Sequence, residues 1–197
     1  IEVSFYQHLS NRCSARVPEP YFIDYDPKTS DGILLLEDMH PAKQIPQMDG
    51  CSSDEVAMVL KEAAALHKSY WNDETLLTYA WLTYGISEER KKFAADLLPA
   101  VYPEWKNRYQ GRISKDIFEM GDTLLSNYEK YADVREGPMT LVQGDLRLDN
   151  LLFTDENNRA ILLDWQTAAV GLPLNDVAYC ISTSFREPNE RAKSEED

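Results

Sequence analysis

Three polar side chains near the end of the chain have the types and spacing that phosphoryl transfer from a magnesium nucleotide requires. Asp145 and Asn150 stand five residues apart, and Asp164 follows a second apolar run. Mg²⁺ takes oxygen ligands, usually one or two from protein and the rest from phosphates and water. Asn150 and Asp164 could supply these oxygens, which leaves Asp145 free to accept the proton of an attacking hydroxyl.

Each of the two carboxylates follows a short apolar run bounded by turn residues, which is the pattern of a buried strand. We therefore expect both where a strand ends and the chain emerges, a common place for chemistry. The alternative is that Asp145, Asn150 and Asp164 are ordinary turn residues, since Asp and Asn favour turns. The predicted strands are 141–142, 151–153 and 160–163, the last two forming a hairpin around 154–159.

The segment 141–179 resembles the aminoglycoside phosphotransferase and choline kinase branch of the protein-kinase-like fold, and is most similar to the ecdysteroid-kinase-like group. The family pattern is His-Gly-Asp-x-x-x-x-Asn, followed by a strand ending in Ile-Asp-Trp or similar. The resemblance implies that Asp145 is the catalytic base and that Asn150 and Asp164 hold the metal. The family His is Gln143 here, which we expect to be tolerated because Gln both donates and accepts hydrogen bonds. Whether it lowers activity is open.

Residues 1–39 resemble a remnant of the N-terminal lobe of that fold. Apolar residues at the first, fifth and ninth positions predict a helix over 1–9. By resemblance, Glu2 is the glutamate that pairs with a phosphate-holding lysine. The alternative is a surface carboxylate near a helix N-terminus, where the helix dipole favours it.

Two strands and a hinge are expected next. The strands are predicted at 21–23 and 33–36, and four consecutive apolar residues in the second indicate burial on both faces. The resemblance makes 37–39 the hinge between lobes, where the Glu37 carbonyl and the Met39 amide would bind the adenine of ATP. A plain strand end is the alternative.

The remainder, 40–197, is expected to be a mostly helical second lobe. A capping box, Ser52 with Glu55, begins a helix whose apolar stripe carries His67, which we interpret as a core histidine. The aromatic segment 72–86 either walls a substrate site or packs in the interior. Two further helices are predicted, at 87–98, stopped by Pro99, and at 113–133.

After Asp164, Asn175 or Asp176 can cap one more helix through Ser184. The resemblance offers Asp176 another role, as the residue that braces the catalytic loop. The tail 187–197 is polar enough to be expected to fray.

The whole chain is expected to be an α+β protein with the two-lobe, protein-kinase-like fold. It has 197 residues, 43% hydrophobic and 27% charged, which suits a globular protein with a real core. The chain begins at Ile1, and the family's glycine-rich strands, lysine and final helices have no match. We therefore interpret it as an excerpt of a longer protein and predict that residues 1–197 alone are inactive.

Composition excludes several classes of function. A net charge of −14 argues against binding nucleic acid, and is compatible with a cationic small substrate. No apolar run reaches the roughly 18 residues of a membrane span. The scattered cysteines, Cys13, Cys51 and Cys180, indicate neither a zinc site nor a disulfide framework, so a cytoplasmic protein is the simplest expectation.

The resulting hypothesis is an ATP-dependent phosphotransferase that moves the γ-phosphate to a hydroxyl of a small molecule. Arg147 could reach that phosphate, since a guanidinium matches phosphate oxygens, or be a solvated loop cation. The alternative function is a nucleotide-binding pseudokinase or regulatory module, which Gln143 and the absent lysine favour. A protein kinase is disfavoured because 165–179 offers no long activation segment. The acceptor stays open.

Overall fold

The computed structural model of the chain describes residues 1–197 apart from 30, 86, 134–135, 156–157 and 196–197. The chain forms two compact units, each treated separately below. The first comprises Ile1–Thr83 and Gly137–Asp197, and the second comprises Tyr84–Glu136. The expected lobe boundary between residues 39 and 40 stays a prediction.

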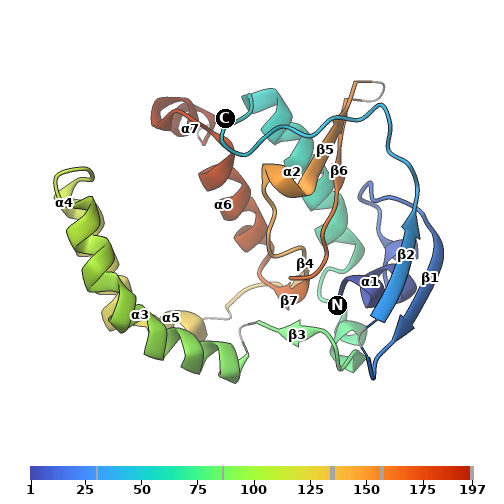
Figure 1. The fold of residues 1–197 in the computed structure, drawn as a ribbon, viewed down its shortest axis with the longest axis horizontal. Coiled ribbons are helices and arrows are strands. Elements are labelled where there is room, and N and C mark those ends of the chain that lie inside the picture. Colours follow the sequence, from blue (N-terminus) through green and yellow to red (C-terminus); the bar gives the residue numbers. More distant parts are fainter. Residues whose placement is uncertain (30, 86, 134–135, 156–157, 196–197) are drawn as a thin grey trace. The chain divides into compact units, whose positions relative to one another are not determined.

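The chain starts with a short helix and a hairpin (Figure 1). Phe5 on the helix and Leu9 at its C-cap are buried, as their spacing predicts, but the first residue of that pattern, Ile1, is 41% exposed. The Phe5 ring stacks on Trp165 with the ring centroids 3.6 Å apart. The strands of the hairpin pair in antiparallel order. The bounds are Glu2–His8 for α1, Ser10–Arg12 for the 3-10 helix η1, Pro20–Asp26 for β1 and Asp31–Leu36 for β2.

The prediction that β2 is buried on both faces is wrong. The side chains of Ile33 and Leu35 are 61% and 55% exposed, whereas Leu34 and Leu36 pack against the core. Alternate side chains of a strand point to opposite faces, and this hairpin covers only one of them. The four apolar residues therefore conceal an ordinary period-two pattern.

A long helix, α2 (Ser53–Ser69), is the centre of the first unit. The predicted capping box is present, with the Ser52 hydroxyl accepting from the Glu55 amide and the Glu55 carboxylate accepting from Ser52. The helix buries Val59 and Leu66 and packs against α6 (Pro173–Ser184) and β6 (Arg159–Leu162) (Figure 1).

Two small sheets position the candidate site, and all their residues except Tyr84 belong to the first unit. β5 and β6 form the predicted hairpin, with Leu151 opposite Leu162. β4 ends just before Gln143, and a three-stranded sheet has the order β3-β7-β4. The remaining bounds are Glu74–Thr78 for η2, Thr83–Tyr84 for β3, Thr140–Val142 for β4, Leu148–Asn150 for η3, Leu151–Thr154 for β5 and Ala169–Gly171 for β7.

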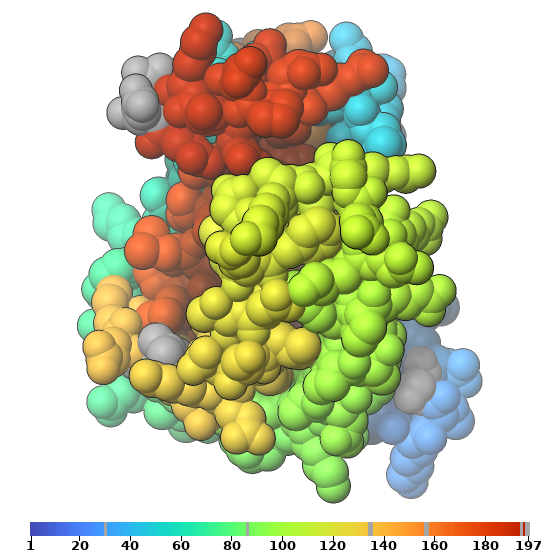
Figure 2. All heavy atoms as spheres, turned by 90° about the vertical axis from the view of Figure 1, so that its left-hand side faces the viewer, coloured from blue at the N-terminus to red at the C-terminus, as the bar shows by residue number. Residues whose placement is uncertain are grey.

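The described part of the second unit contains three helices, whose atoms form the green-to-yellow surface in Figure 2. They are α3 (Glu88–Tyr109), α4 (Lys115–Ser126) and α5 (Tyr128–Asp133). Ser87 caps α3 as predicted, but Pro99 does not stop the helix, which also contains Pro103. A proline removes one backbone donor. Packing against α4 offsets this loss, since the Tyr102 hydroxyl donates to the Phe118 carbonyl at 3.0 Å.

The predicted helix 113–133 is likewise wrong in its continuity. The chain leaves the helical conformation at Asn127, which has φ −122° and ψ 17°, and this divides α4 from α5. The side-chain amide of Asn127 donates to the Thr123 carbonyl, so this side chain competes with the backbone for a helix acceptor.

The tail predicted to fray forms a further helix, α7 (Pro188–Ser194). Pro188 stands in its first turn, where a missing N–H costs little, and an ion pair of 3.3 Å joins Arg191 to Glu195. Among the described helices, none is both long and apolar enough to cross a membrane.

Candidate active site

The segment 143–150, called the catalytic loop below, is fixed from beneath by one buried carboxylate. Asp176, 1% exposed on α6, accepts 2.9 Å hydrogen bonds from the backbone N–H groups of Gln143 and Gly144. The His67 ring lies 3.0 Å from the same carboxylate. Asp176 makes no capping bond to α6, so its bracing role is observed and its capping role is not. His67 is the predicted core histidine.

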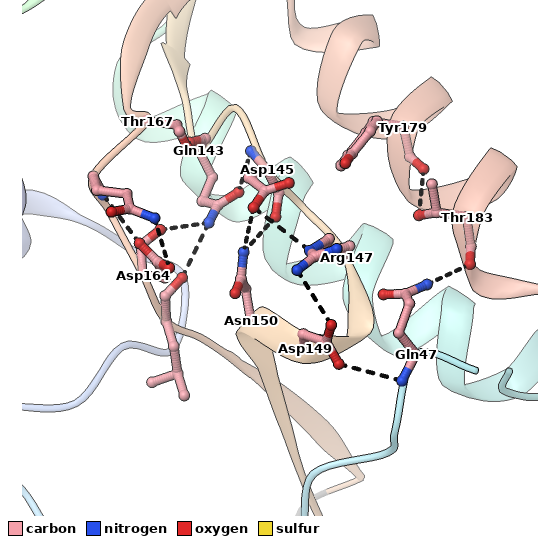
Figure 3. Close-up of polar contacts among 12 residues, drawn as sticks. Gln47, Gln143, Asp145, Arg147, Asp149, Asn150, Asp164, Thr167, Tyr179 and Thr183 are labelled. Carbon is pink, nitrogen blue, oxygen red and sulfur yellow. Dashed lines mark hydrogen bonds and ion pairs between the residues drawn. The ribbon is translucent and has the colours of Figure 1, made fainter. Parts of the chain in front are cut away.

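Gln143 joins the two segments that carry the expected catalytic and metal-binding residues (Figure 3). Its amide nitrogen donates to the carbonyls of Leu163 and Asp164, at 3.0 and 2.6 Å. Its amide oxygen accepts from the Asp145 backbone N–H at 2.7 Å. The fully buried side chain uses both its donor and acceptor capacity, as the sequence argument for its tolerance required.

Gly144 can be no other residue without strain. Its φ of +85° lies in the left-handed region, and an added Cβ would stand 2.6 Å from the Thr167 carbonyl oxygen. The Thr167 hydroxyl donates to the Gln143 carbonyl at 2.9 Å. The backbone on either side of the turn is therefore packed too closely for a side chain.

Asp145 emerges from this turn with its carboxylate partly exposed. The Asn150 side-chain nitrogen donates to the Asp145 carboxylate and to the Asp145 carbonyl, both at 2.9 Å. Tyr179 approaches from α6, and burial together with a hydrogen bond to Asp145 raises the pKa of the tyrosine (Figure 3). The Asn150 side chain thus orients the carboxylate, and Tyr179 lies close enough to feel its charge.

Arg147 lies between two carboxylates. Its Nε is 3.6 Å from Asp145 and its terminal nitrogen is 3.2 Å from Asp149. The Gln47 backbone N–H donates to the other Asp149 oxygen at 3.3 Å. The guanidinium is therefore held beside Asp145, and its expected contact with a γ-phosphate stays a prediction.

Asp164 stands on a strained turn after β6, with φ +56°. Its carboxylate accepts from the backbone and side chain of Gln166, at 3.3 and 3.2 Å. Burial raises the pKa of the Glu2 carboxyl, the Trp165 backbone N–H lowers it, and the nearby Asp164 carboxylate raises it further. The structure thus brings the start of α1 to the turn that carries Asp164.

Asn150 connects the two parts of the site. Because its amide nitrogen faces Asp145, its amide oxygen is left for another partner, and its backbone carbonyl accepts from Leu163 at 3.0 Å. No cluster of three His, Cys, Asp or Glu residues that could hold a metal occurs in the described part of the chain. A site built from Asn150 and Asp164 would therefore depend on oxygens from nucleotide and water, as Mg²⁺ sites commonly do.

The expected adenine-binding residues make their hydrogen bonds with residues outside this cluster. The Glu37 side chain accepts from Arg16 at 2.7 Å, and this bond lowers the pKa of the Glu37 carboxyl. The Met39 carbonyl accepts from Ala42 at 2.8 Å, and among the described residues the Met39 amide has no acceptor. Their contact with adenine stays a prediction.

Two residues of this site escaped the sequence analysis. Tyr179 stands three residues after Asp176, so helical spacing places the two on neighbouring positions of one face of α6 and could have revealed it. Asp149 lies inside the loop itself, but nothing in the local sequence indicates that it faces Arg147.

Comparison with curated relatives finds local similarity. The chain is 32% identical over 79 residues to acyl-CoA dehydrogenase family member 11 of Homo sapiens, a match that covers 38% of this chain and 10% of the relative. It is 34% identical over 85 residues to family member 10 of Mus musculus, covering 43% of this chain and 8% of the relative. These matches span about a tenth of the length of the curated relatives.

Solved structures match over nearly the whole chain. The GDP complex of an aminoglycoside 2'-phosphotransferase-IIIa variant superposes with a TM-score of 0.65 at 14% identity, covering 98% of this chain and 62% of that one. Choline kinase LicA from Streptococcus pneumoniae gives a TM-score of 0.56 at 15% identity, covering 98% and 59%. The expected kinase-like α+β fold class is confirmed.

The family assignment agrees with these folds. The family model for the phosphotransferase enzyme family matches residues 1–194. This confirms the resemblance drawn from the sequence at the level of the superfamily, while the ecdysteroid-kinase-like group stays a prediction. The chain belongs to the phosphotransferase enzyme family.

Proposed function

We propose that this chain carries the catalytic loop of an ATP-dependent phosphotransferase that transfers the γ-phosphate to a hydroxyl of a small molecule. The observation that carries the proposal is the setting of Asp145. Its partly exposed carboxylate stands at the end of β4, is oriented by Asn150 at 2.9 Å, and lies beside the guanidinium of Arg147.

Asp145 acts as the base. With one carboxylate oxygen held by the Asn150 amide, the carboxylate can orient an acceptor hydroxyl and take its proton as the oxygen attacks phosphorus. The γ-phosphoryl group is transferred from ATP, ADP departs as the leaving group, and the acceptor oxygen stays in the new phosphate ester. Positioning and charge compensation supply most of the catalysis in such reactions.

Asn150 and Asp164 suit Mg²⁺ because they offer one amide oxygen and one carboxylate, both hard ligands. Support comes from the Asn150 orientation, in which the nitrogen is engaged by Asp145 and the oxygen is spare. When bound with the nucleotide, the ion neutralises negative charge on the phosphates. Gln143 keeps the two segments in register through its bonds to Asp145 and Asp164.

Four further residues would bind the nucleotide. The Glu37 carbonyl and the Met39 amide are proposed to contact adenine, and the Met39 amide lacks an acceptor among the described residues. The Asp164 carboxylate is close enough to Glu2 to raise the pKa of the Glu2 carboxyl, which supports a place for Glu2 near the phosphates. Arg147 would move from Asp149 towards the γ-phosphate, since a phosphate offers a guanidinium two oxygens.

The test is substitution of the base in the complete protein. Asp145→Asn should lower kcat by about a thousandfold, roughly 4 kcal/mol of transition-state stabilisation, because it removes the proton acceptor but keeps the shape. ADP release measured with Mg-ATP across hydroxyl-bearing metabolites gives the rate. The matched control is Asp155→Asn, which changes a carboxylate that is 99% exposed and should leave the rate unchanged.

The same assay, together with ATP binding, distinguishes a phosphotransferase from a nucleotide-binding module without turnover. Asp164→Asn should raise the Mg²⁺ concentration needed for half-maximal turnover by at least tenfold, because it removes one ligand charge. Turnover by Asp145→Asn within tenfold of wild type would end the proposed role. Mg-dependent ATP binding without ADP release by the wild-type protein would instead identify a nucleotide-binding module without turnover.

A further inference from the structure

A hollow of about 350 Å³ lies beside the catalytic loop, between α6 and the segment that precedes α2. Its wall includes Arg147 and Tyr179, which both contact Asp145. A molecule in this hollow would therefore sit within reach of the proposed base. The wall also includes Gln47, Met48, Thr183, Phe185 and Arg186.

The charge of the wall is opposite to that of the whole chain. Among the described residues, Arg147 and Arg186 are the charged ones that line the hollow, and no carboxylate lines it, although the net charge of the chain is −14. Arg147 already faces Asp145 and Asp149. Arg186 has no ion-pair partner among the described residues. Its guanidinium is thus available to a ligand.

Two buried polar atoms at the hollow also lack partners. The side-chain oxygen of Gln47 and the Nε of Arg147 are buried, and neither makes a hydrogen bond within the described structure. The 3.6 Å between that Nε and Asp145 exceeds hydrogen-bond length. A buried polar group without a partner is costly, so these atoms favour a polar occupant that supplies both a donor and an acceptor.

Close contacts join the segment before α2 to the end of α6 and fix the two walls of the hollow. A Cβ at Gly50, where φ is +70°, would lie 2.7 Å from the Arg186 backbone nitrogen, so the two segments approach as closely as glycine permits. The Cys51 N–H donates to the Ser184 carbonyl at 2.8 Å, and the Gln47 side chain donates to the Thr183 carbonyl. The backbone of Arg186 is therefore fixed at the rim of the hollow.

Building on the proposed phosphotransferase function, we propose that the hollow binds an acidic group of the acceptor, which makes the acceptor a hydroxyl-bearing carboxylate or phosphate ester. The Arg186 guanidinium matches the paired oxygens of both acids. The Gln47 oxygen would accept from a hydroxyl, and Met48 and Phe185 add apolar surface. An amine would instead meet the guanidinium of Arg186, with no carboxylate among the described lining residues, so the net acidity of the chain is a poor guide to its substrate.

Four compounds that share one diol scaffold test this directly. Glycerol is neutral, glycerate carries a carboxylate, glycerol 3-phosphate carries a phosphate, and 3-amino-1,2-propanediol carries an ammonium. ADP release by the complete protein should be at least tenfold more efficient, as kcat/KM, for one of the two acids than for the amine, with glycerol between them. The relative rates of the two acids separate the carboxylate from the phosphate.

Charge reversal assigns the effect to the hollow. Arg186→Glu should lower kcat/KM for the acids by tenfold or more, leave glycerol within about threefold, and raise the rate with the amine. Arg191→Glu is the matched control, because it makes the same change on α7 at a residue that does not line the hollow. The control should leave the order of the four compounds unchanged.

Binding without turnover separates this inference from the function on which it rests. Ligand-observed NMR titration of glycerate and of 3-amino-1,2-propanediol, without nucleotide, should show binding of glycerate that Arg186→Glu weakens. That result supports an acid-binding hollow even if no compound releases ADP, an outcome that would contradict only the proposed function. A preference for the amine, or glycerate binding that is indifferent to Arg186, overturns the inference while leaving a measured phosphotransferase activity intact.

Discussion

The inner and outer sides of the catalytic loop differ in how completely their polar groups are bonded. On the inner side, Asp176 is 1% exposed and is bonded by Gln143, Gly144 and His67. On the outer side, the Asp145 side chain is 27% exposed, and its ion pair with Arg147 is a loose 3.6 Å. Both carboxylates belong to one network, yet only the outer one has room for a substrate.

This difference divides the work of the loop between stability and chemistry. A buried carboxylate with three donors fixes backbone geometry, and losing it leaves those donors unsatisfied. An exposed carboxylate in a loose pair contributes little to folding, since solvent screens it. Replacement by Asn should therefore chiefly lower the free energy of unfolding at Asp176 and chiefly lower turnover at Asp145.

The largest effect on stability is expected for Asp176→Asn. The amide that replaces one carboxylate oxygen would face a backbone N–H, so the free energy of unfolding should fall by about 3 kcal/mol. Asp145→Asn is the matched variant, with a change under about 1 kcal/mol. Urea unfolding followed by circular dichroism measures both. Equal losses for the two variants would erase the distinction between the inner and outer sides.

Gln143 should show the next largest effect. Gln143→Leu keeps much of the volume but leaves the Asp145 N–H and two carbonyls without their partner, which should cost about 2 kcal/mol and reduce turnover. Gln143→His is the control, because an imidazole can still donate and accept. The measurements are urea unfolding and ADP release. Full stability of Gln143→Leu would show that this bridge between the two segments is dispensable.

The sequence predicts the elements around the site well, for reasons that are local. Apolar runs bounded by turn formers correctly place β4, β5 and β6, and the Ser52 capping box correctly places the start of α2. Asp145, Asn150 and Arg147 lie within one short loop, so their proximity follows from the chain itself. Their roles towards ATP and Mg²⁺ stay predictions.

What the sequence misses depends on contacts between distant residues. The Gln143 side chain reaches the Asp164 carbonyl, 21 positions away, and no local pattern encodes that bond. The bond from the Gln143 backbone to Asp176, 33 positions away, is expected only from the family resemblance. Likewise α3 continues past Pro99 because packing against α4 outweighs the loss of a backbone donor. The sequence gives no sign of a binding role for Arg186, because only folding brings it to the hollow beside Arg147.

The smallest effect concerns the thiols, which report on how often the inner side opens. Burial raises the pKa of Cys180 to about 11, and Cys180 is fully buried on α6, four residues after Asp176. At pH 8 the folded protein should hold on the order of one thiolate per thousand molecules at this site, against a much larger fraction in the unfolded chain, whose ordinary thiol pKa is about 8.5. Stability due to this thiol is complete below about pH 8.5 and is lost as pH rises towards 11.

Labelling by a disulfide reagent at pH 8 measures this opening in a variant that keeps only Cys180, with Cys13→Ser and Cys51→Ser. The native protein should react at least a hundredfold more slowly than the same variant in urea, because the thiol is both buried and protonated. Adding Asp176→Asn should speed labelling, since it weakens the inner side of the loop, whereas adding Asp145→Asn should not. If both additions accelerate labelling equally, the outer carboxylate also holds the loop closed, and the separation of stability from chemistry fails.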